Sequence, residues 1–245
     1  MKKLQYLFWG LCFILSHTFA KAQVSHQLWD NLLKKHVDDK GMVDYGGIKA
    51  DSLVFNTYLE ILKTNHPNEK KWSKEAQMAY WINAYNAFTV KLIIDNYPLK
   101  SIKDIKKGIP FVNTVWDIKF IKIGKNTYDL NNIEHSKLRK KFNDPRIHFA
   151  INCASLSCPN LSNKAYFPEN LSKQLDEAAK NFINDTSKNI IQKNKVQLSK
   201  IFSWYQGDFM QNRTLFDFLN KYSITKIDNN ASIDYLDYSW NLNGK

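Results

Sequence analysis

The chain has 245 residues, with 35 Lys and Arg against 23 Asp and Glu, which gives a formal net charge of +12. Its 44% hydrophobic content, with only 8 glycines and 6 prolines, is typical of an ordered globular protein and excludes a low-complexity chain. The positive charges occur mostly as single lysines, which indicates a solvated surface. Attraction to anionic envelope polymers is the functional alternative.

The first 22 residues have the pattern of a secretory signal peptide. Two lysines precede an apolar run over residues 4–16, which is too short to cross a bilayer as a helix. The Ala-Lys-Ala of residues 20–22 is a cleavage signal, and an uncleaved anchor is the alternative. We therefore expect residues 23–245 to form a single periplasmic or extracellular domain, with no stable transmembrane anchor and no nucleic acid as partner.

Helical periodicity dominates the N-terminal half of the chain. Apolar residues at helical spacing predict helices over 24–38 and 51–63. The strongest prediction is a helix over about 74–96, and because it is apolar on nearly every face we expect it in the middle of the fold. Asn83 and Asn86 lie on one face of this helix, where they either satisfy loop backbone or line a site.

Shorter elements are predicted from residue 108 onward, where strand-like alternation becomes common. In chain order these are a hairpin over 108–130, a helix over 132–142 capped by Asn131 and Glu134, a strand over 145–152, a helix over 168–185, a strand and turn within 195–209, a helix over 214–222 and a terminal strand over 231–243. The fold class predicted from this order is α+β, with the helix at 74–96 packed on a mostly antiparallel sheet.

The candidate chemistry gathers in residues 147–161, IHFAINCASLSCPNL. If the preceding strand is regular, His148 and Cys153 point to opposite faces. Pro159 at the first position of a helix would instead make Cys158 its N-cap, where the helix terminus favours a thiolate. We therefore expect Cys158 to be the nucleophile and His148 its base, with Cys153 as the alternative nucleophile.

Further site residues are expected around this centre, although each could instead be structural. Glu134, His135 or Asp208 could orient His148, and two arginines could bind a substrate carboxylate in two-point fashion. The residues expected to contact substrate are Asn83, Asn86, Arg139, Arg146, Trp204, Tyr205 and Asp208. The spacing of the cysteines matches no standard zinc pattern, so neither a metal nor another cofactor is expected.

A Cys153–Cys158 disulfide is the competing interpretation, because disulfides persist outside the cytoplasm. The chain would then be a non-catalytic envelope binding domain whose ligand is an unknown peptide-like or envelope molecule. No histidine follows either cysteine, so the usual papain order of Cys, His and then Asp or Asn is impossible here. A thiol enzyme built on these cysteines needs a permuted or independent arrangement.

Six ordered motifs resemble the domain of unknown function 547 family. They are AYWINAYNAFTVKLI (79–93), NNIEHSKLR (131–139), DPRIHFAINCASLSCPNL (144–161), FPENLSKQLDEAAKNFIND (167–185), SKIFSWYQGDF (199–209) and YLDYSWNLN (235–243). The resemblance implies a secreted or envelope protein of a bacterium, since plant members join the domain to a coiled coil. It implies no established activity, and only a distant, permuted similarity to papain-like or transglutaminase-like enzymes. Together with the residues, it leads us to expect an exported thiol-dependent hydrolase or acyltransferase acting on peptide-like bonds.

Overall fold

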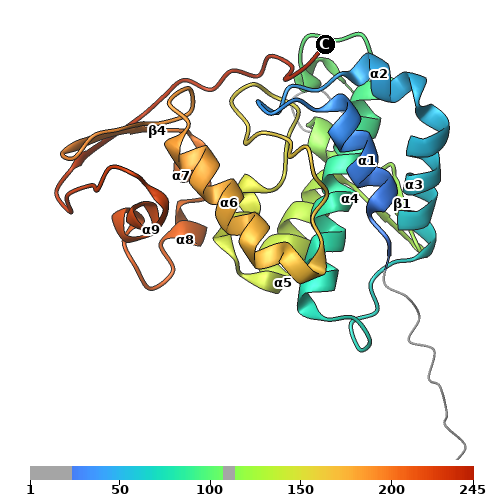
Figure 1. The fold of residues 1–245 in the computed structure, drawn as a ribbon, viewed down its shortest axis with the longest axis horizontal. Coiled ribbons are helices and arrows are strands. Elements are labelled where there is room, and N and C mark those ends of the chain that lie inside the picture. The colour runs from blue at the N-terminus through green and yellow to red at the C-terminus, as the bar shows by residue number, and fades with distance from the viewer. Residues whose placement is uncertain (1–23, 107–113) are drawn as a thin grey trace, which may run out of the picture.

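A computed structural model describes residues 24–106 and 114–245, so the predicted signal peptide lies outside the described residues. The fold is α+β, as predicted (Figure 1). The α-helices are α1 (Gln27–His36), α2 (Tyr45–Ala50), α3 (Ser52–Thr64), α4 (Lys74–Asp95), α5 (Lys140–Phe142), α6 (Leu171–Asn184), α7 (Ile201–Trp204), α8 (Gln206–Phe209) and α9 (Leu215–Tyr222). Single 3-10 turns form η1 (Ile102–Asp104), η2 (Val115–Asp117), η4 (Pro145–Phe149) and η5 (Pro168–Asn170), and η3 (Asn132–Arg139) is a π-helix. The strands are β1 (Ile121–Ile123), β2 (Asn126–Tyr128), β3 (Ile190–Ile191), β4 (Lys195–Leu198) and β5 (Ser232–Tyr235).

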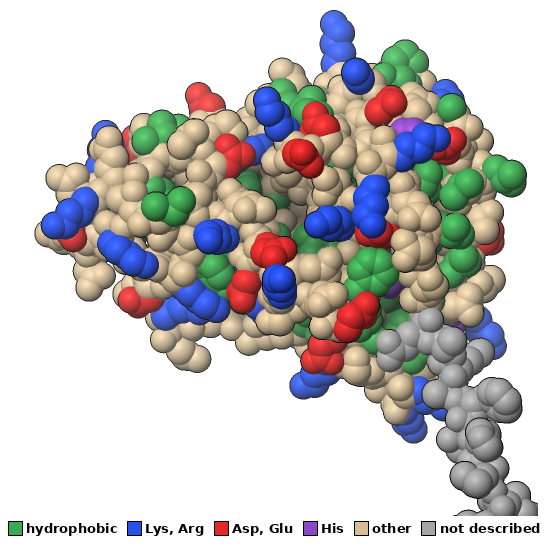
Figure 2. Space-filling view, in the orientation of Figure 1, with side chains coloured by type: hydrophobic (Ala, Val, Ile, Leu, Met, Phe, Trp, Pro, Cys, Tyr) green, Lys and Arg blue, Asp and Glu red, His purple; other side chains and the backbone are tan. Residues whose placement is uncertain are grey.

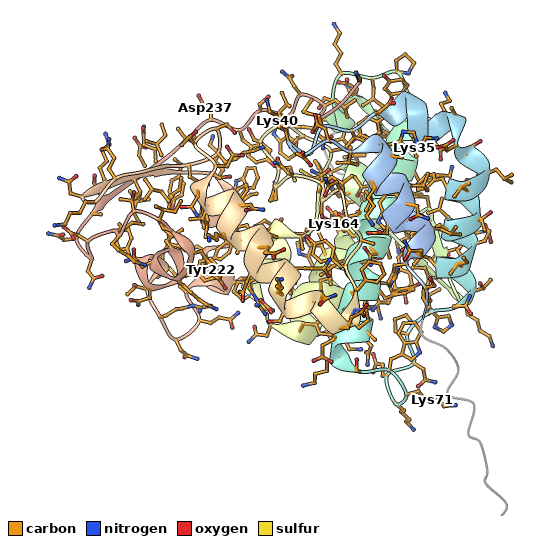
Figure 3. All side chains as sticks on the ribbon, viewed as in Figure 1. Lys35, Lys40, Lys71, Lys164, Tyr222 and Asp237 are labelled. Atoms are coloured by element: carbon orange, nitrogen blue, oxygen red, sulfur yellow. The ribbon has the colours of Figure 1, made fainter. Side chains whose placement is uncertain are left out.

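Two hydrophobic cores divide the molecule into two lobes. The first core lies among α1 to α4, and the second joins β4 with α7, α8 and α9 (Figure 1). Lys35 on α1 and Tyr222 on α9 mark the two lobes in Figure 3. Helix α6 connects them, because Leu175 belongs to the first core while Phe182 and Ile183 belong to the second.

Helix α4 is the centre of the first lobe, as its uniformly apolar sequence predicts. All but a few of its residues are buried, and helices α2, α3, η3 and η5 pack around it. The Ser73 hydroxyl accepts a hydrogen bond from the amide of Ala76 at 3.1 Å, which satisfies one of the free donors of the first turn. A buried helix of this length gives the neighbouring loops a rigid surface to pack against.

The strands of the described residues form two small sheets rather than one, and residues 108–113 of the predicted hairpin lie outside the described residues. Strands β1 and β2 make an antiparallel hairpin that turns at Gly124, whose φ of +58° favours glycine. The alternation at Trp116–Phe120 does not form a strand, because Asp117 accepts hydrogen bonds from the amide and hydroxyl of Thr114 and closes the tight turn η2. The predicted hairpin is therefore shorter than its sequence pattern.

The second sheet has the order β3-β4-β5 and lies in the C-terminal lobe. Strand β4 pairs antiparallel with β3 and parallel with β5. The predicted terminal strand over 231–243 is wrong beyond Tyr235, because the chain there leaves the sheet and crosses back to the first lobe.

This C-terminal tail joins the lobes. The backbone of Asn243 and Lys245 pairs with Val43, and the amide of Leu156 donates to the carbonyl of Asn241 at 2.8 Å. Only glycine fits at position 244, because a Cβ there would lie 2.1 Å from the Val43 carbonyl oxygen. The tail therefore holds its aromatic side chains at the junction of the lobes.

The visible surface carries its charges in a mixed pattern. Lys and Arg side chains alternate with Asp and Glu over both lobes rather than forming one basic face (Figure 2). None of the described helices combines the length and the apolar character that a bilayer crossing requires.

Candidate functional site

A pocket of about 290 Å³ lies where the two lobes meet the C-terminal tail. Helices α4 and α7, the short helices η2, η3 and η4, the cysteine loop and the C-terminal tail contribute side chains to it, and aromatic rings form much of its wall. The lining residues are Tyr85, Trp116, Asn131, Glu134, His148, Ile151, Cys153, Cys158, Pro159, Ile201, Trp204, Tyr205, Tyr238 and Trp240. The structure thus brings both cysteines, His148, Glu134, Trp204 and Tyr205 of the predicted site residues together in one pocket.

The segment before the cysteines is not the predicted strand. Pro145–Phe149 forms the 3-10 helix η4 because the Asp144 side chain accepts from the amide of Arg146 at 3.0 Å and the proline occupies the first turn. The prediction that His148 and Cys153 point to opposite faces of a regular strand therefore does not apply. Both side chains line the pocket.

The segment after the cysteines is not a helix either. Residues 159–167 have irregular backbone, so Cys158 is not an N-cap. The Lys188 ammonium instead holds this loop from behind, donating to the carbonyls of Leu156 and Cys158. Burial lowers the pKa of Lys188, and the two carbonyls satisfy its buried head group. The expected activation of Cys158 by a helix terminus is absent.

Cys153 sits on a constrained turn. Ala154, the next residue, has a φ of +58°, an unfavourable backbone conformation for a residue with a Cβ. Its amide donates to Asn152 Oδ1 at 2.9 Å, while Asn152 Nδ2 donates to the Pro159 carbonyl at 2.7 Å. Asn152 therefore closes the loop that presents Cys153, a strained feature of the kind that often marks a functional site.

The two thiols have different surroundings. Both are free, and Cys153 is half-buried whereas Cys158 is only 5% exposed. Burial alone would raise the pKa of Cys153, but hydrogen bonds from Cys158, Ser155 and Tyr238 outweigh it and lower that pKa below its ordinary value. Burial and the hydrogen bond to Cys153 raise the pKa of Cys158. The environment therefore favours Cys153 as the thiolate.

His148 is held by a carboxylate. Its Nε2 lies 2.7 Å from Asp208 Oδ2, and its ring stacks on Tyr205 with centroids 3.9 Å apart. Asp208 also accepts two hydrogen bonds from the Arg139 guanidinium, at 2.6 and 2.9 Å. Burial opposes ionisation of Asp208, but these bonds from His148 and Arg139 hold its pKa far below the usual range. Of the three predicted orienting groups, Asp208 is the one that contacts His148.

Glu134 reaches the pocket from the π-helix η3, and the predicted capping box does not form. The amide of Asn132 donates to Asp129 Oδ1 at 2.6 Å, so Asp129 takes the capping role, while Asn131 Nδ2 donates to Asp117. The Glu134 side chain is thereby free to turn inward, where it is 6% exposed. No hydrogen bond joins it to His148 among the described residues.

Several predicted site residues lie outside the pocket and bind other parts of the chain. Asn83 Nδ2 donates to the Tyr166 carbonyl and Asn83 Oδ1 accepts from the Tyr166 amide. Arg146 pairs with Asp144 and Asp176 on the surface, and His135 contacts Arg139 at 3.0 Å. These residues position segments of the site rather than facing a ligand.

Asn86 also binds backbone groups of the loop that leads to Cys153, and its substitution tests whether such contacts position this loop. Its side chain bonds the Ala150 carbonyl and the Asn152 amide, both at 2.9 Å, directly before Cys153. Asn86→Ala leaves both backbone groups buried without a partner, so we expect a loss of about 2–4 kcal/mol in the free energy of unfolding by urea. The exposed Asn56→Ala on α3 is the matched control, with a change within about 0.5 kcal/mol. A loss below about 1 kcal/mol for Asn86→Ala would contradict this role.

Sequence reasoning missed the tail residues of the site. Tyr238 lies 3.4 Å from Cys153 Sγ and accepts a hydrogen bond from Ser155 at 3.2 Å. Trp240 packs on Tyr238 with ring centroids 4.7 Å apart. Both rings lie in the C-terminal motif YLDYSWNLN, whose density of aromatic residues was the available signal. Tyr85, Trp116, Ser155 and Lys188 had no comparable signal.

The described residues hold no group of three or more His, Cys, Asp or Glu side chains suited to a metal ion. Comparison with known proteins identifies one family model, described as a protein of unknown function, DUF547, which matches residues 69–183. The match spans α4, the cysteine loop and most of α6. No curated protein and no solved structure matches the chain.

Proposed function

Since the chain belongs to the DUF547 family, whose description assigns no activity, we propose on the chemistry of its pocket that it is a thiol-dependent hydrolase or acyltransferase acting on peptide-like bonds. The observation that carries the proposal is the placement of Cys153. It is a half-buried thiol with a lowered pKa that lines the same pocket as a histidine fixed by Asp208. A lowered thiol pKa and an oriented histidine are the two requirements of cysteine nucleophiles.

The proposed reaction has two steps. The Cys153 thiolate attacks the substrate carbonyl, forming a sulfur–carbon bond, and the bond to the leaving amine breaks as His148 donates a proton to the nitrogen. Water or an acceptor amine then attacks the thioester while His148 takes up its proton, which frees the thiolate. Asp208 stabilises the imidazole in its protonated form, before the first proton transfer and after the second, and holds the neutral ring in place between them.

Arg139 and Tyr205 support the histidine without contacting the reacting atoms. The Arg139 guanidinium binds Asp208 through two nitrogens and lies 4.9 Å from the Tyr205 ring, which stacks on His148. A planar guanidinium is suited to this two-point contact. Their role is to fix the orientation of the His148 ring.

The test is to trap the acyl-enzyme. Incubation with p-nitrophenyl acetate, followed by intact and peptide mass spectrometry, should show one acetyl group on Cys153 and release of p-nitrophenol. Acetylation of Cys158 alone, or of neither cysteine, would overturn the proposed nucleophile. Ligand binding by the pocket without any acyl transfer would favour the non-catalytic binding domain.

We further propose export, which the sequence of residues 1–22 supports. Protein recovered outside the cytoplasm of an expressing bacterium should begin at Gln23 by N-terminal sequencing. Ala22→Arg places a large charge beside the cleavage position and should block processing, whereas Lys21→Ala, between the two small residues, should leave it intact. Full-length protein in the cytoplasm alone would contradict export.

A further inference from the structure

Glu134 is a buried carboxylate with one unsatisfied oxygen and no ion-pair partner among the described residues. Its Oε1 is inaccessible and makes no hydrogen bond within the described part of the chain. Its donors there are limited to two tyrosine hydroxyls, since Tyr85 lies 3.5 Å from Oε2 and Tyr205 also interacts with the carboxylate. Arg139, the nearby cation, is occupied by Asp208 and His135. Burying a carboxylate without a donor is costly, so an unsatisfied one in a pocket points to a donor supplied by a ligand.

Four aromatic rings line the same pocket and contact one another. Trp116, Trp204, Tyr238 and Trp240 have neighbouring ring centroids between 4.7 and 6.1 Å apart. The face of an aromatic ring attracts cations, tryptophan most strongly. One such contact already exists at this cluster, because Lys103 Nζ lies 4.9 Å from the centroid of Trp240.

The arrangement disfavours an anionic ligand. The two arginines predicted to bind a substrate carboxylate are both engaged by aspartates outside the pocket, and Lys188 is engaged behind the cysteine loop. A carboxylate entering beside Glu134 would meet a like charge, and the one pocket-lining side chain among the described residues that can carry a positive charge, His148, is already paired with Asp208. The charge distribution therefore selects for a positive group.

We infer that the pocket binds an organic ammonium group, held by Glu134 and by the faces of the four rings. This inference builds on the proposed function, since it names the substrate class: an acyl donor or acceptor that carries an alkylammonium or quaternary ammonium group near the reacting carbonyl. A pocket of about 290 Å³ accommodates one such head group together with the atoms next to it.

The direct test compares two probes of equal size. Choline and its uncharged counterpart 3,3-dimethyl-1-butanol differ by one positive charge, and isothermal titration calorimetry gives the Kd of each. We expect choline to bind at least about tenfold more tightly, as one cation–π or ionic contact of this kind provides. Equal affinity of the two probes would overturn the inference.

Variants of pocket residues test whether the preference for choline arises in this pocket. Glu134→Gln keeps the shape of the side chain and should weaken choline binding at least about tenfold while leaving binding of the uncharged probe unchanged. Glu60→Gln, the same change at an exposed position on α3, should alter neither Kd. Should Glu134→Gln fail to fold, Trp204→Leu at a 48% exposed position provides the second test, with selective loss of choline affinity expected.

The same preparation separates this inference from the proposed function. Acetylation of Cys153 by p-nitrophenyl acetate does not require an ammonium group. Acetylation without any preference for choline would overturn the inference and leave the proposed function in place. If choline binds selectively, Glu134→Gln abolishes that binding and Cys153 is never acetylated, the proposed function is overturned and the inference of an ammonium site is kept.

Discussion

Cys153→Ser should abolish acyl-enzyme formation from p-nitrophenyl acetate at every pH, a loss on the order of 10³-fold or more. Serine retains the shape of the side chain, but its hydroxyl is not ionised near neutral pH and no described hydrogen bond joins residue 153 to a base. The measurement is the initial burst of p-nitrophenol per mole of protein between pH 6 and 10. A burst of wild-type size from Cys153→Ser would refute the proposed nucleophile.

Cys158→Ser is the informative companion variant. Cys158 contributes one of the hydrogen bonds that lower the pKa of Cys153, so its loss should shift the acylation profile toward higher pH without abolishing the reaction. The expected result is an acylation rate that is lower than that of the wild type at pH 7 and recovers at alkaline pH, where the Cys153 thiol ionises without this hydrogen bond. If Cys158 were the nucleophile, its replacement would abolish the burst at all pH values and Cys153→Ser would not.

The helical half of the fold could be predicted because its signals are local. The periodicity of α3 and the apolar faces of α4 can be recognised from the residues of each segment alone. The structure has both helices within a residue or two of the predicted bounds. The alternation at Trp116–Phe120 and the apolar run at 145–152 were also local, yet they form turns. In both places an aspartate side chain accepts a hydrogen bond from a nearby backbone amide: Asp117 from Thr114, and Asp144 from Arg146. These local bonds stabilise a turn in place of the strand that the pattern predicts.

The composition of the candidate site could be predicted only in part. His148, Cys153, Cys158 and Glu134 were identifiable as residue types suited to thiol chemistry, and the pocket contains all four. Their relations depend on contacts distant in sequence, such as the 60 residues between His148 and Asp208 and the 85 between Cys153 and Tyr238. The lowered pKa of Cys153 follows from those contacts, and residue spacing in the sequence does not predict them.

Asp208→Asn should lower the rate of Cys153 acylation by about 10²–10⁴-fold. Asp208 contacts His148 Nε2 at 2.7 Å and supplies the negative charge that stabilises the imidazolium, which an amide cannot supply. The rate of the p-nitrophenol burst measures this effect. Asp237→Asn, at a fully exposed position labelled in Figure 3, is the matched control and should leave the rate unchanged. A less than threefold effect of Asp208→Asn would exclude the orienting role.

The same substitution should also change how stability depends on pH. The pKa of Asp208 is depressed in the folded state, so its ion pairs stabilise the fold above the unfolded-state pKa of about 3.9, and this contribution is lost as the pH falls through the acid range. After allowance for solvent screening of this partly exposed group, Asp208→Asn should cost about 1–2 kcal/mol at pH 7. Urea titrations should show that difference beginning to shrink below about pH 5 and continuing to shrink as the pH falls below 3 toward the depressed pKa of Asp208 in the folded state. A difference that stays constant over that range would mean that the charge of Asp208 is not what holds His148 and Arg139 together.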